Sequence, residues 1–402
     1  MFIKREIADF IEEIRKQFPV ILITGPRQVG KTTVLREDFP DYNYVSLDDS
    51  EARNLAQRDP MLFLKTYRHP LIIDEVQYAP ELFVGIKMIV DEKRENGLFL
   101  LTGSQKFRLM RGVSESMAGR VAILDMLGLS NAEILGRKCQ IFDPESIDFS
   151  YKDPANVGEI YAKIWKGSFP AFYKDVGSNW SVFFRSYVST YLERDIRDLM
   201  RVSDERTFLL FLTFLASRTG QLLNMAEVAR EVGIDNKTAK SWLSIVETTG
   251  LVHLLYPYYR NVTKRLIKTP KLYFLDTGLA CYLAKINSPE ILEASYLSGA
   301  MFETYVFCEL LKSFWNRGRD APFYFYRDRD MKEIDLLMEQ NGVLYPIEIK
   351  KTAMPSRTAT KNFSVLEKIG VKVGHGVVIC LVNSPIPISE TVIAIPVGAI
   401  GC

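Results

Sequence analysis

Short apolar runs alternate with amphipathic segments of helical length along the first third of the 402-residue chain. Residues 3–17 place apolar side chains at helical spacing, which predicts an amphipathic helix beside the first strand. Strands separated by helix-length segments predict a parallel sheet with helices on both faces, an α/β fold. The expected strands are residues 20–23, 43–47, 71–73, 98–102 and 121–124.

Helical periodicity dominates after a polar connection. The connection, residues 139–156, contains proline together with several Asp, Ser and Asn residues, so we expect a domain boundary there. Apolar positions then recur at helical spacing over residues 157–165 and 182–200. The sequence therefore predicts a second, helical region behind the first domain.

Capping residues mark a pair of helices further along the chain. Asn224 caps a predicted helix that ends at Gly233, and Asp235 caps a second one that ends at Gly250. The β-rich run 251–255 follows, and this order predicts a winged helix-turn-helix. The start of the second helix would meet base edges in a DNA reader, whereas the alternative is a module used only for packing or protein contact. The residues at that start are Lys237, Thr238, Lys240 and Ser241.

The last part of the chain alternates strands and helices again. A helix is expected over residues 301–312 and strands over 323–326, 333–338 and 343–350. Asn341-Gly342 stands between the last two strands and predicts a hairpin. These patterns divide the chain into domains at residues 1–140, 141–205, 206–275 and 276–402.

Composition narrows the class of protein without identifying it. Charged residues make up 25% and apolar residues 47% of the chain, as in ordinary soluble proteins. The net charge of +2 gives no global argument for nucleic acid. The five cysteines are scattered, which suits a reducing cytoplasm. We see no signal-peptide pattern and no apolar run of about 18 residues, so we expect a cytoplasmic protein without a membrane span.

A glycine-rich loop follows the first predicted strand and opens a helix. It fits G-x-x-x-x-G-K-[ST], in the strand, loop and helix order that a P-loop requires. Its glycines allow backbone N–H groups and the helix N-terminus to point at phosphate oxygens. We expect Lys31 to reach the β- and γ-phosphates of ATP and the Thr32 hydroxyl to ligate Mg²⁺. The predicted ATP-binding residues are Gly25, Pro26, Arg27, Gln28, Val29, Gly30, Lys31, Thr32 and Thr33.

Two carboxylates downstream favour this interpretation over a plain glycine-rich turn. The strand at 71–73 is followed by Asp74, which is expected to hold Mg²⁺, and by Glu75, which is expected to orient or activate the attacking water. Ser104 or Gln105 follows the fourth strand and acts either as a sensor of the γ-phosphate or as part of a turn.

Arg120 immediately precedes the fifth predicted strand. Guanidinium binds phosphate oxygens bidentately, so one interpretation is an arginine finger, acting in cis or from a neighbouring subunit of a homo-oligomer. The competing interpretation is a structural salt bridge.

The motifs GPRQVGKTT at 25–33, LIIDEVQ at 71–77, LTGSQ at 101–105 and AGRV at 118–121 belong together. As a set they resemble prokaryotic AAA-type ATPases that carry a C-terminal domain of unknown function 4143. The resemblance covers nearly the whole chain. It implies an ATP-binding fold coupled to a C-terminal region of little-studied activity, and it implies that residues 141–205 form a helical lid and connector. In that lid Arg194 either touches nucleotide or belongs to a solvated charged face.

Four residues of the last domain form another candidate site. Glu348 and Lys350 share one face of a strand, Asp335 lies on the adjoining strand, and Glu303 belongs to the preceding helix. Glu303, Asp335 and Glu348 could hold Mg²⁺ and activate water against a phosphodiester, with Lys350 beside them. The pattern resembles the restriction-endonuclease-like superfamily, PD-(D/E)xK. The alternative is a fold that keeps these residues for packing or nucleic-acid binding.

Two functions are consistent with these motifs. The first is a Mg²⁺-dependent AAA-type ATPase that repositions the winged helix and the nuclease-like domain on DNA or RNA. The second is a nucleotide switch that recruits protein partners without cutting strands. A strip that contains tyrosines and basic residues but no acids suits a phosphate backbone and favours the first. Its basic residues are Arg260, Lys264, Arg265, Lys268 and Lys271.

Overall fold

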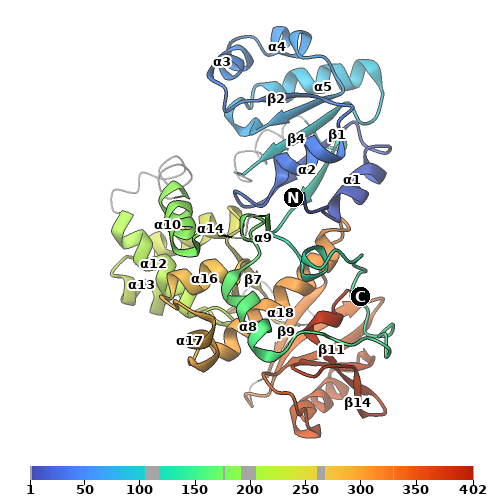
Figure 1. The fold of residues 1–402 in the computed structure, drawn as a ribbon, viewed down its shortest axis with the longest axis vertical. Coiled ribbons are helices and arrows are strands. Elements are labelled where there is room, and N and C mark those ends of the chain that lie inside the picture. The colour runs from blue at the N-terminus through green and yellow to red at the C-terminus, as the bar shows by residue number, and fades with distance from the viewer. Residues whose placement is uncertain are drawn as a thin grey trace.

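The computed structural model describes residues 2–104, 117–174, 177–191, 205–259, 268–328 and 330–401. Figure 1 shows an N-terminal sheet region in blue, a largely helical region in green and yellow, and a C-terminal sheet region in orange and red. Among the described residues, no helix is both long and apolar enough to cross a membrane. Several residues singled out above lie outside the described ranges: Gln105, Arg194, Arg260, Lys264 and Arg265.

The N-terminal region is built on a five-stranded parallel sheet. Its strands are β1 (Val20–Thr24), β2 (Asn43–Ser46), β3 (Leu71–Asp74), β4 (Phe99–Gly103) and β5 (Val121–Asp125). Its helices are α1 (Ile7–Ile14), α2 (Lys31–Asp38), α3 (Ser50–Arg58), α4 (Pro60–Thr66), η1 (Val76–Tyr78), α5 (Leu82–Lys93) and α7 (Asn131–Ile134). The strand order is β2-β3-β4-β1-β5, and every pairing is parallel, which confirms the predicted α/β fold.

Both faces of this sheet are covered by helices. Because successive side chains of a strand point to opposite faces, Ile21 and Ile23 of β1 join the core formed with α1 and α2. Val20 and Leu22 join the core formed with α3, α4 and α5. The loop after β1 therefore leaves from an inner strand of a sheet that is covered on both sides.

The helical region contains a small antiparallel sheet in the order β6-β8-β7. Its helices are α8 (Val157–Lys166), α9 (Ala171–Lys174), α10 (Trp180–Thr190), α12 (Glu205–Ser217), α13 (Met225–Val232), α14 (Asn236–Thr248), α16 (Thr277–Leu283) and α17 (Pro289–Ala294). Its strands are β6 (Gln221–Leu222), β7 (Val252–Leu255) and β8 (Lys271–Phe274). α16 and α17, which follow residue 276, pack on α8.

The predicted caps lie where the sequence indicates. The Asn224 side chain accepts hydrogen bonds from two amides of α13, and Asp235 does the same for α14. The side chain of Glu227 pairs with Arg218, while the amide of Glu227 donates to Asn224. From α12 to β8 the order is therefore helix, short strand, two helices and two strands.

The C-terminal region is a mixed seven-stranded sheet in the order β14-β15-β13-β11-β10-β9, with β12 paired to β11. Its strands are β9 (Phe323–Arg327), β10 (Glu333–Gln340), β11 (Val343–Ile349), β12 (Lys372–Val373), β13 (Gly376–Cys380), β14 (Ile386–Ser389) and β15 (Val392–Pro396). Its helical elements are α18 (Ser298–Trp315), η3 (Arg357–Thr360), η4 (Phe363–Ile369) and η5 (Val397–Ala399). Asn341 and Gly342, with φ of 53° and 75°, turn β10 into β11 as predicted.

Two segments join the regions. Residues 135–156 form neither helix nor strand and run along the C-terminal region, where the Asp153 amide donates to the Asn383 carbonyl at 2.8 Å. α18 is buried along most of its length and contacts α8, α16, β8 and β11. At its far end, Lys312 Nζ donates to the Leu129 carbonyl at 2.9 Å, and Glu309 accepts from the Asn131 amide at 2.8 Å. One helix thus contacts both the exit of β5 and the C-terminal sheet.

Candidate functional site

The predicted P-loop turns sharply between β1 and α2. Gly25, Gln28 and Gly30 all have positive φ, at 142°, 62° and 97°. A Cβ at Gly25 would lie 2.1 Å from the carbonyl oxygen of Met126, so only glycine fits there. Gly30 stands at the N-terminus of α2, whose first amides have no partner within the helix. This is the backbone arrangement that receives phosphate oxygens.

Lys31 is folded back over its own loop. Its ammonium donates to the carbonyls of Gly25 at 2.9 Å and Pro26 at 2.7 Å, and the residue is 5% exposed. Arg27 and Thr33 are half-buried along the same loop. The carbonyl contacts hold the positive charge within the loop, where the phosphates of a bound nucleotide would be its alternative partners.

Thr32 and Asp74 meet between the P-loop and the end of β3. The Thr32 hydroxyl donates to Asp74 Oδ1 at 2.7 Å, and the Thr102 hydroxyl donates to the same oxygen. The Tyr44 hydroxyl donates to Asp74 Oδ2 at 3.3 Å. A hydroxyl and a carboxylate at hydrogen-bond distance are oxygen ligands of the kind Mg²⁺ takes, so these residues fit that ion.

Glu75 and Ser104 are also brought together. Glu75 follows β3 with φ of 56°, a left-handed conformation that is uncommon for this residue type. Its carboxylate accepts from the Gln77 amide and, at 3.3 Å, from the Ser104 hydroxyl, while its own N–H donates to Thr102 at 3.1 Å. The carboxylate is therefore positioned by residues at the ends of two neighbouring strands.

Arg5 is a site residue that sequence reasoning missed. Its guanidinium, 3% exposed, forms an ion pair with Glu133 at 2.9 Å and donates to the P-loop carbonyl of Val29 at 2.7 Å. The same group donates to the carbonyls of Leu127 at 2.8 Å and Gly128 at 3.1 Å. Arg5 thus ties the P-loop to the segment after β5. An arginine before an amphipathic helix carries no local signal of partners this distant in sequence.

The P-loop also contacts the helical region. Gly250 follows α14 with φ of 74°, and a Cβ there would lie 3.1 Å from Cδ of Pro26. A cavity of about 240 Å³ lies beside this contact, lined by the P-loop, the end of β5, the end of α14 and Trp315 of α18. All three regions of the chain therefore border one space next to the P-loop.

Arg120 lies at the amino-terminal ends of the strands, whereas the P-loop lies at their carboxyl ends. Its carbonyl accepts from the amide of Val20, the first residue of β1, whereas the P-loop follows the last residue of that strand. Its guanidinium pairs with Asp91 of α5 through two contacts, one of 2.5 Å and one of 3.1 Å. A finger acting in cis would have to span a strand of five residues, about 16 Å long, that separates the two ends. The salt bridge forms, and a role in trans stays a prediction.

The candidate acids of the C-terminal region pair in two groups with two different lysines, although the charge of Asp335 also acts on Lys271 and Glu303. In the first group, Glu303 of α18 accepts from the Tyr273 hydroxyl at 2.5 Å and from Lys271 Nζ at 3.3 Å. Lys271 also pairs with Glu333 at 2.7 Å, and Arg327 lies 3.5 Å from that carboxylate.

The second group lies on β10 and β11. Asp335 Oδ2 accepts from the Ile349 amide at 2.9 Å and from Lys350 Nζ at 3.3 Å. Glu348 Oε1 is 2.6 Å from Lys350 Nζ, while Glu348 Oε2 is buried without a hydrogen-bond partner. Burial, followed by repulsion from Asp335, raises the pKa of Glu348 to about 7. A buried carboxylate oxygen without a partner suits a cation, so Asp335 and Glu348 fit a metal ion.

Glu303, Asp335 and Glu348, the three acids predicted to bind one metal ion, do not converge on a single point in the structure. Among the described residues, no three His, Cys, Asp or Glu side chains converge as metal ligands would. Lys271 and Tyr273 bind the carboxylate of Glu303 in this conformation, and its ligand role stays a prediction. Asp335, Glu348 and Lys350 do lie together, as the sequence pattern indicates.

The predicted nucleic-acid surface is only partly exposed. Lys237, Lys240 and Ser241 are exposed on the first turns of α14, whereas Thr238 donates its hydroxyl to Asp235 of the cap. Lys271 is 3% exposed and ion-paired, so its assignment to the basic strip is wrong.

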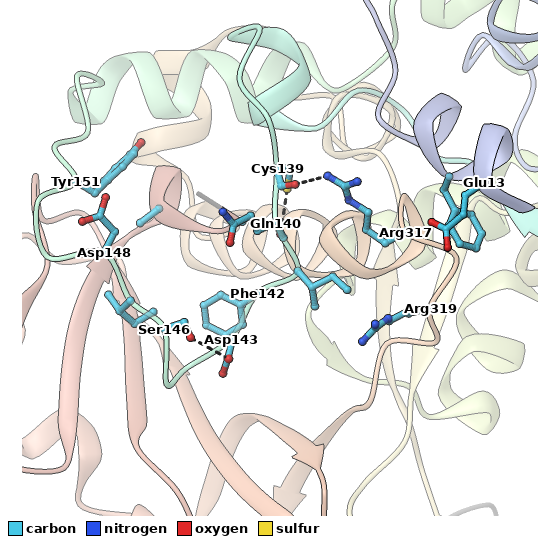
Figure 2. A pocket seen from close by; sticks show the side chains of 15 residues that line it. Glu13, Cys139, Gln140, Phe142, Asp143, Ser146, Asp148, Tyr151, Arg317 and Arg319 are labelled. Carbon is cyan, nitrogen blue, oxygen red and sulfur yellow. Dashed lines mark hydrogen bonds between the residues drawn. The ribbon is translucent and has the colours of Figure 1, made fainter. Parts of the chain in front are cut away.

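A cavity larger than the one beside the P-loop lies away from all of these residues. It measures about 510 Å³ and lies between α1, the segment after residue 138 and the end of α18. Figure 2 shows Arg317 and Arg319 on one side, with Arg317 donating to the Cys139 carbonyl at 2.6 Å, and Asp143 bound by Ser146 on another. None of the predicted site residues lines it. Its size alone does not make it the candidate site.

Comparisons with solved structures give only distant similarity. The Walker-type ATPase PABY2304 of Pyrococcus abyssi is 13% identical, with 69% of this chain and 94% of that chain covered and a TM-score of 0.43. A RuvB variant of Thermotoga maritima is 16% identical, with 62% and 87% covered and a TM-score of 0.30. Because both TM-scores lie below 0.5, a family assignment must rest on sequence.

Sequence comparisons cover the chain from end to end. An AAA-domain model matches residues 17–135, a domain of unknown function 8612 matches 158–290, and domain of unknown function 4143 (DUF4143) matches 298–400. "Uncharacterized protein Rv2008c" of Mycobacterium tuberculosis is 30% identical over 403 residues, which is 99% of this chain and 84% of that protein. "Uncharacterized protein Mb2031c" of Mycobacterium bovis matches with the same values. The chain belongs to the family of P-loop AAA-domain proteins that carry a C-terminal DUF4143 domain.

Proposed function

We propose that this AAA-domain protein is a Mg²⁺-dependent ATPase whose nucleotide state repositions its helical and C-terminal regions on nucleic acid. The observation that carries the proposal is the contact between Pro26 of the P-loop and Gly250 at the end of α14. A nucleotide that moves the loop would also disturb this contact, because even a β-carbon at Gly250 would crowd Pro26. The end of α14 is thereby coupled to the ATP site.

Each residue around the P-loop has a separate role in the proposed hydrolysis of ATP. Lys31 would exchange its carbonyl partners for the β- and γ-phosphates, and Thr32 and Asp74 would hold Mg²⁺, which would supply positive charge to the phosphate oxygens. Glu75 orients or activates water, and Ser104, hydrogen-bonded to it, senses the γ-phosphate. The remaining loop residues donate backbone N–H groups.

Two variants test these roles. Lys31→Ala should lose most affinity for ATP, because the phosphates lose their point charge. Glu75→Gln should bind ATP as the wild type does and hydrolyse it far more slowly. Equilibrium binding of a fluorescent ATP analogue and steady-state phosphate release measure the two quantities. Unchanged affinity in the first variant, or normal turnover in the second, would contradict the assignment.

The C-terminal half is proposed to act on DNA or RNA. Residues 206–275 would form the winged helix, with Lys237 and Lys240 toward base edges. Residues 276–402 would form a nuclease-like domain in which Asp335, Glu348 and Lys350 serve cleavage. Here a metal ion would polarise the phosphodiester and activate water, while Lys350 would stabilise negative charge that develops on the phosphate.

Strand cleavage in Mg²⁺ or Mn²⁺ tests this half independently of the ATPase. Asp335→Ala, Glu348→Ala and Lys350→Ala should each abolish cleavage and leave ATP hydrolysis intact, since the two sites share no residue. Nucleic-acid affinity that falls steeply with salt would support the same function. Absence of both cleavage and binding would favour the alternative, a nucleotide switch that recruits protein partners. A cytoplasmic location and a homo-oligomer in which Arg120 acts in trans complete the proposal.

A further inference from the structure

Lys271 reaches the C-terminal acids from another part of the fold. It is the first residue of β8, in the small sheet of the helical region. Its backbone pairs with Leu222 of β6 on one side and with Leu255 of β7 on the other. Because both neighbouring strands fix this backbone, the ammonium is delivered to a defined position beside α18 and β10.

The surroundings of Lys271 are those of a bound cation. The residue is 3% exposed, and its ammonium lies 2.7 Å from Glu333, 3.3 Å from Glu303 and 5.6 Å from the ring centre of Phe325. The Tyr273 hydroxyl occupies a further position on Glu303. The Glu303 side chain is 16% exposed and that of Glu333 31%, and both carboxylates contact the buried ammonium of Lys271, which supplies positive charge between them.

We propose that the Lys271 ammonium takes the place of a divalent cation between Glu303 and Glu333. The C-terminal cluster then holds one metal ion at most, at Asp335 and Glu348. This inference rests on the metal site proposed above for those two residues. It adds that Glu303, the remaining acid of the nuclease-like pattern, binds the Lys271 ammonium instead of the metal ion.

The two lysines of the cluster differ in how readily they can leave it. The side chain of Lys350 is 39% exposed and can swing into solvent, which would free Asp335 and Glu348 for a metal ion. Glu348 Oε2 is buried without a partner even when Lys350 is in place. Lys271 has no such route, since moving a 3% exposed ammonium away from its carboxylates would leave a buried charge unpaired. Exchange with metal is therefore confined to the Lys350 group.

The test replaces the positively charged side chain of Lys271 with a neutral side chain of similar length. In Lys271→Met, Glu303 loses its cation and Glu333 keeps only Arg327, so the full-length protein without nucleotide should bind one more Mn²⁺ per chain than the wild type. Electron paramagnetic resonance of free Mn²⁺ gives the number bound. Lys268→Met, an exposed position three residues earlier, is the matched control, and Lys271→Arg keeps the charge. Both should bind the wild-type number, and any Mn²⁺ at the P-loop adds equally to every variant.

An unchanged Mn²⁺ number in folded Lys271→Met would overturn the proposal. If that variant does not fold, Glu303→Gln decides: the wild-type number of Mn²⁺ supports the proposal, and the loss of one ion overturns it. Glu348→Gln separates this inference from the proposed function. If Glu348→Gln binds as much Mn²⁺ as the wild type, the metal site at Asp335 and Glu348 fails, while a gain in Lys271→Met still shows that the lysine excludes metal.

Discussion

Replacing Glu348 with glutamine should stabilise the C-terminal sheet at pH 8 and have little effect at pH 4.5. Burial, followed by the nearby Asp335 carboxylate, raises the pKa of Glu348 from its ordinary 4.5 to about 7. The folded state therefore prefers the protonated carboxyl, so stability is complete below pH 4.5 and is lost as the pH rises to about 7. The difference between these two values, at about 1.4 kcal/mol per unit, amounts to about 3 kcal/mol at pH 8. Glutamine cannot ionise and avoids this loss.

Amide hydrogen exchange of peptides from β10 and β11 measures the effect, because a chain of this size unfolds in several units and lacks a single free energy of unfolding. Without divalent metal, the opening free energy of the wild type should fall between pH 5 and 8, after correction for intrinsic exchange, while that of Glu348→Gln should stay level. Glu390→Gln, at an exposed position in the same region, is the control and should follow the wild type. Equal pH dependence in Glu348→Gln and the wild type would refute the reasoning.

The remaining predictions concern the nucleotide site and the contacts that support it. Gly250→Ala should raise the KM for ATP more than Gly233→Ala does, because both positions have positive φ but only Gly250 touches the P-loop; equal effects would contradict the coupling. Arg5→Met should lower the local opening free energy of the N-terminal region by about 3–5 kcal/mol, because a buried carboxylate is left unpaired; amide hydrogen exchange of peptides from that region measures the loss, and Arg5→Lys should recover part of it. Mixing inactive Arg120→Ala and Lys31→Ala subunits should restore some ATP turnover if the arginine acts in trans, and a strictly monomeric protein would exclude that role.

Features set by neighbouring residues could be predicted from the sequence. The strand, glycine-rich loop and helix around Lys31 depend on local turn chemistry, and so does the hairpin at Asn341-Gly342. Asp335 and Glu348 could be placed together because the hairpin and the two-residue period of a strand fix their register. In each case the chain carries both the geometry and the side chains within a few residues.

Contacts between distant segments could not be predicted. Lys271 belongs to a basic run that suggests solvent exposure, and only the packing of β8 against α18 shows that it is a buried partner of Glu303 and Glu333. Arg5 joins Val29 across 24 residues and Leu127 across 122, with no periodicity to mark the pairing. Pattern reasoning fails at these places because a charged residue looks the same in sequence whether it is solvated or paired.

The contacts of the segment that follows β5 determine which fragments of this protein keep their packing. The Leu129 carbonyl and the Asn131 amide depend on Lys312 and Glu309 of α18, and the Leu129 amide donates to the Ser168 carbonyl at 2.7 Å. A fragment that stops at residue 140 would leave these three backbone groups to water and strip α7 of its cover. Biochemistry on an isolated ATPase fragment would thus describe a damaged nucleotide site, whereas point variants of the intact chain keep its supporting contacts.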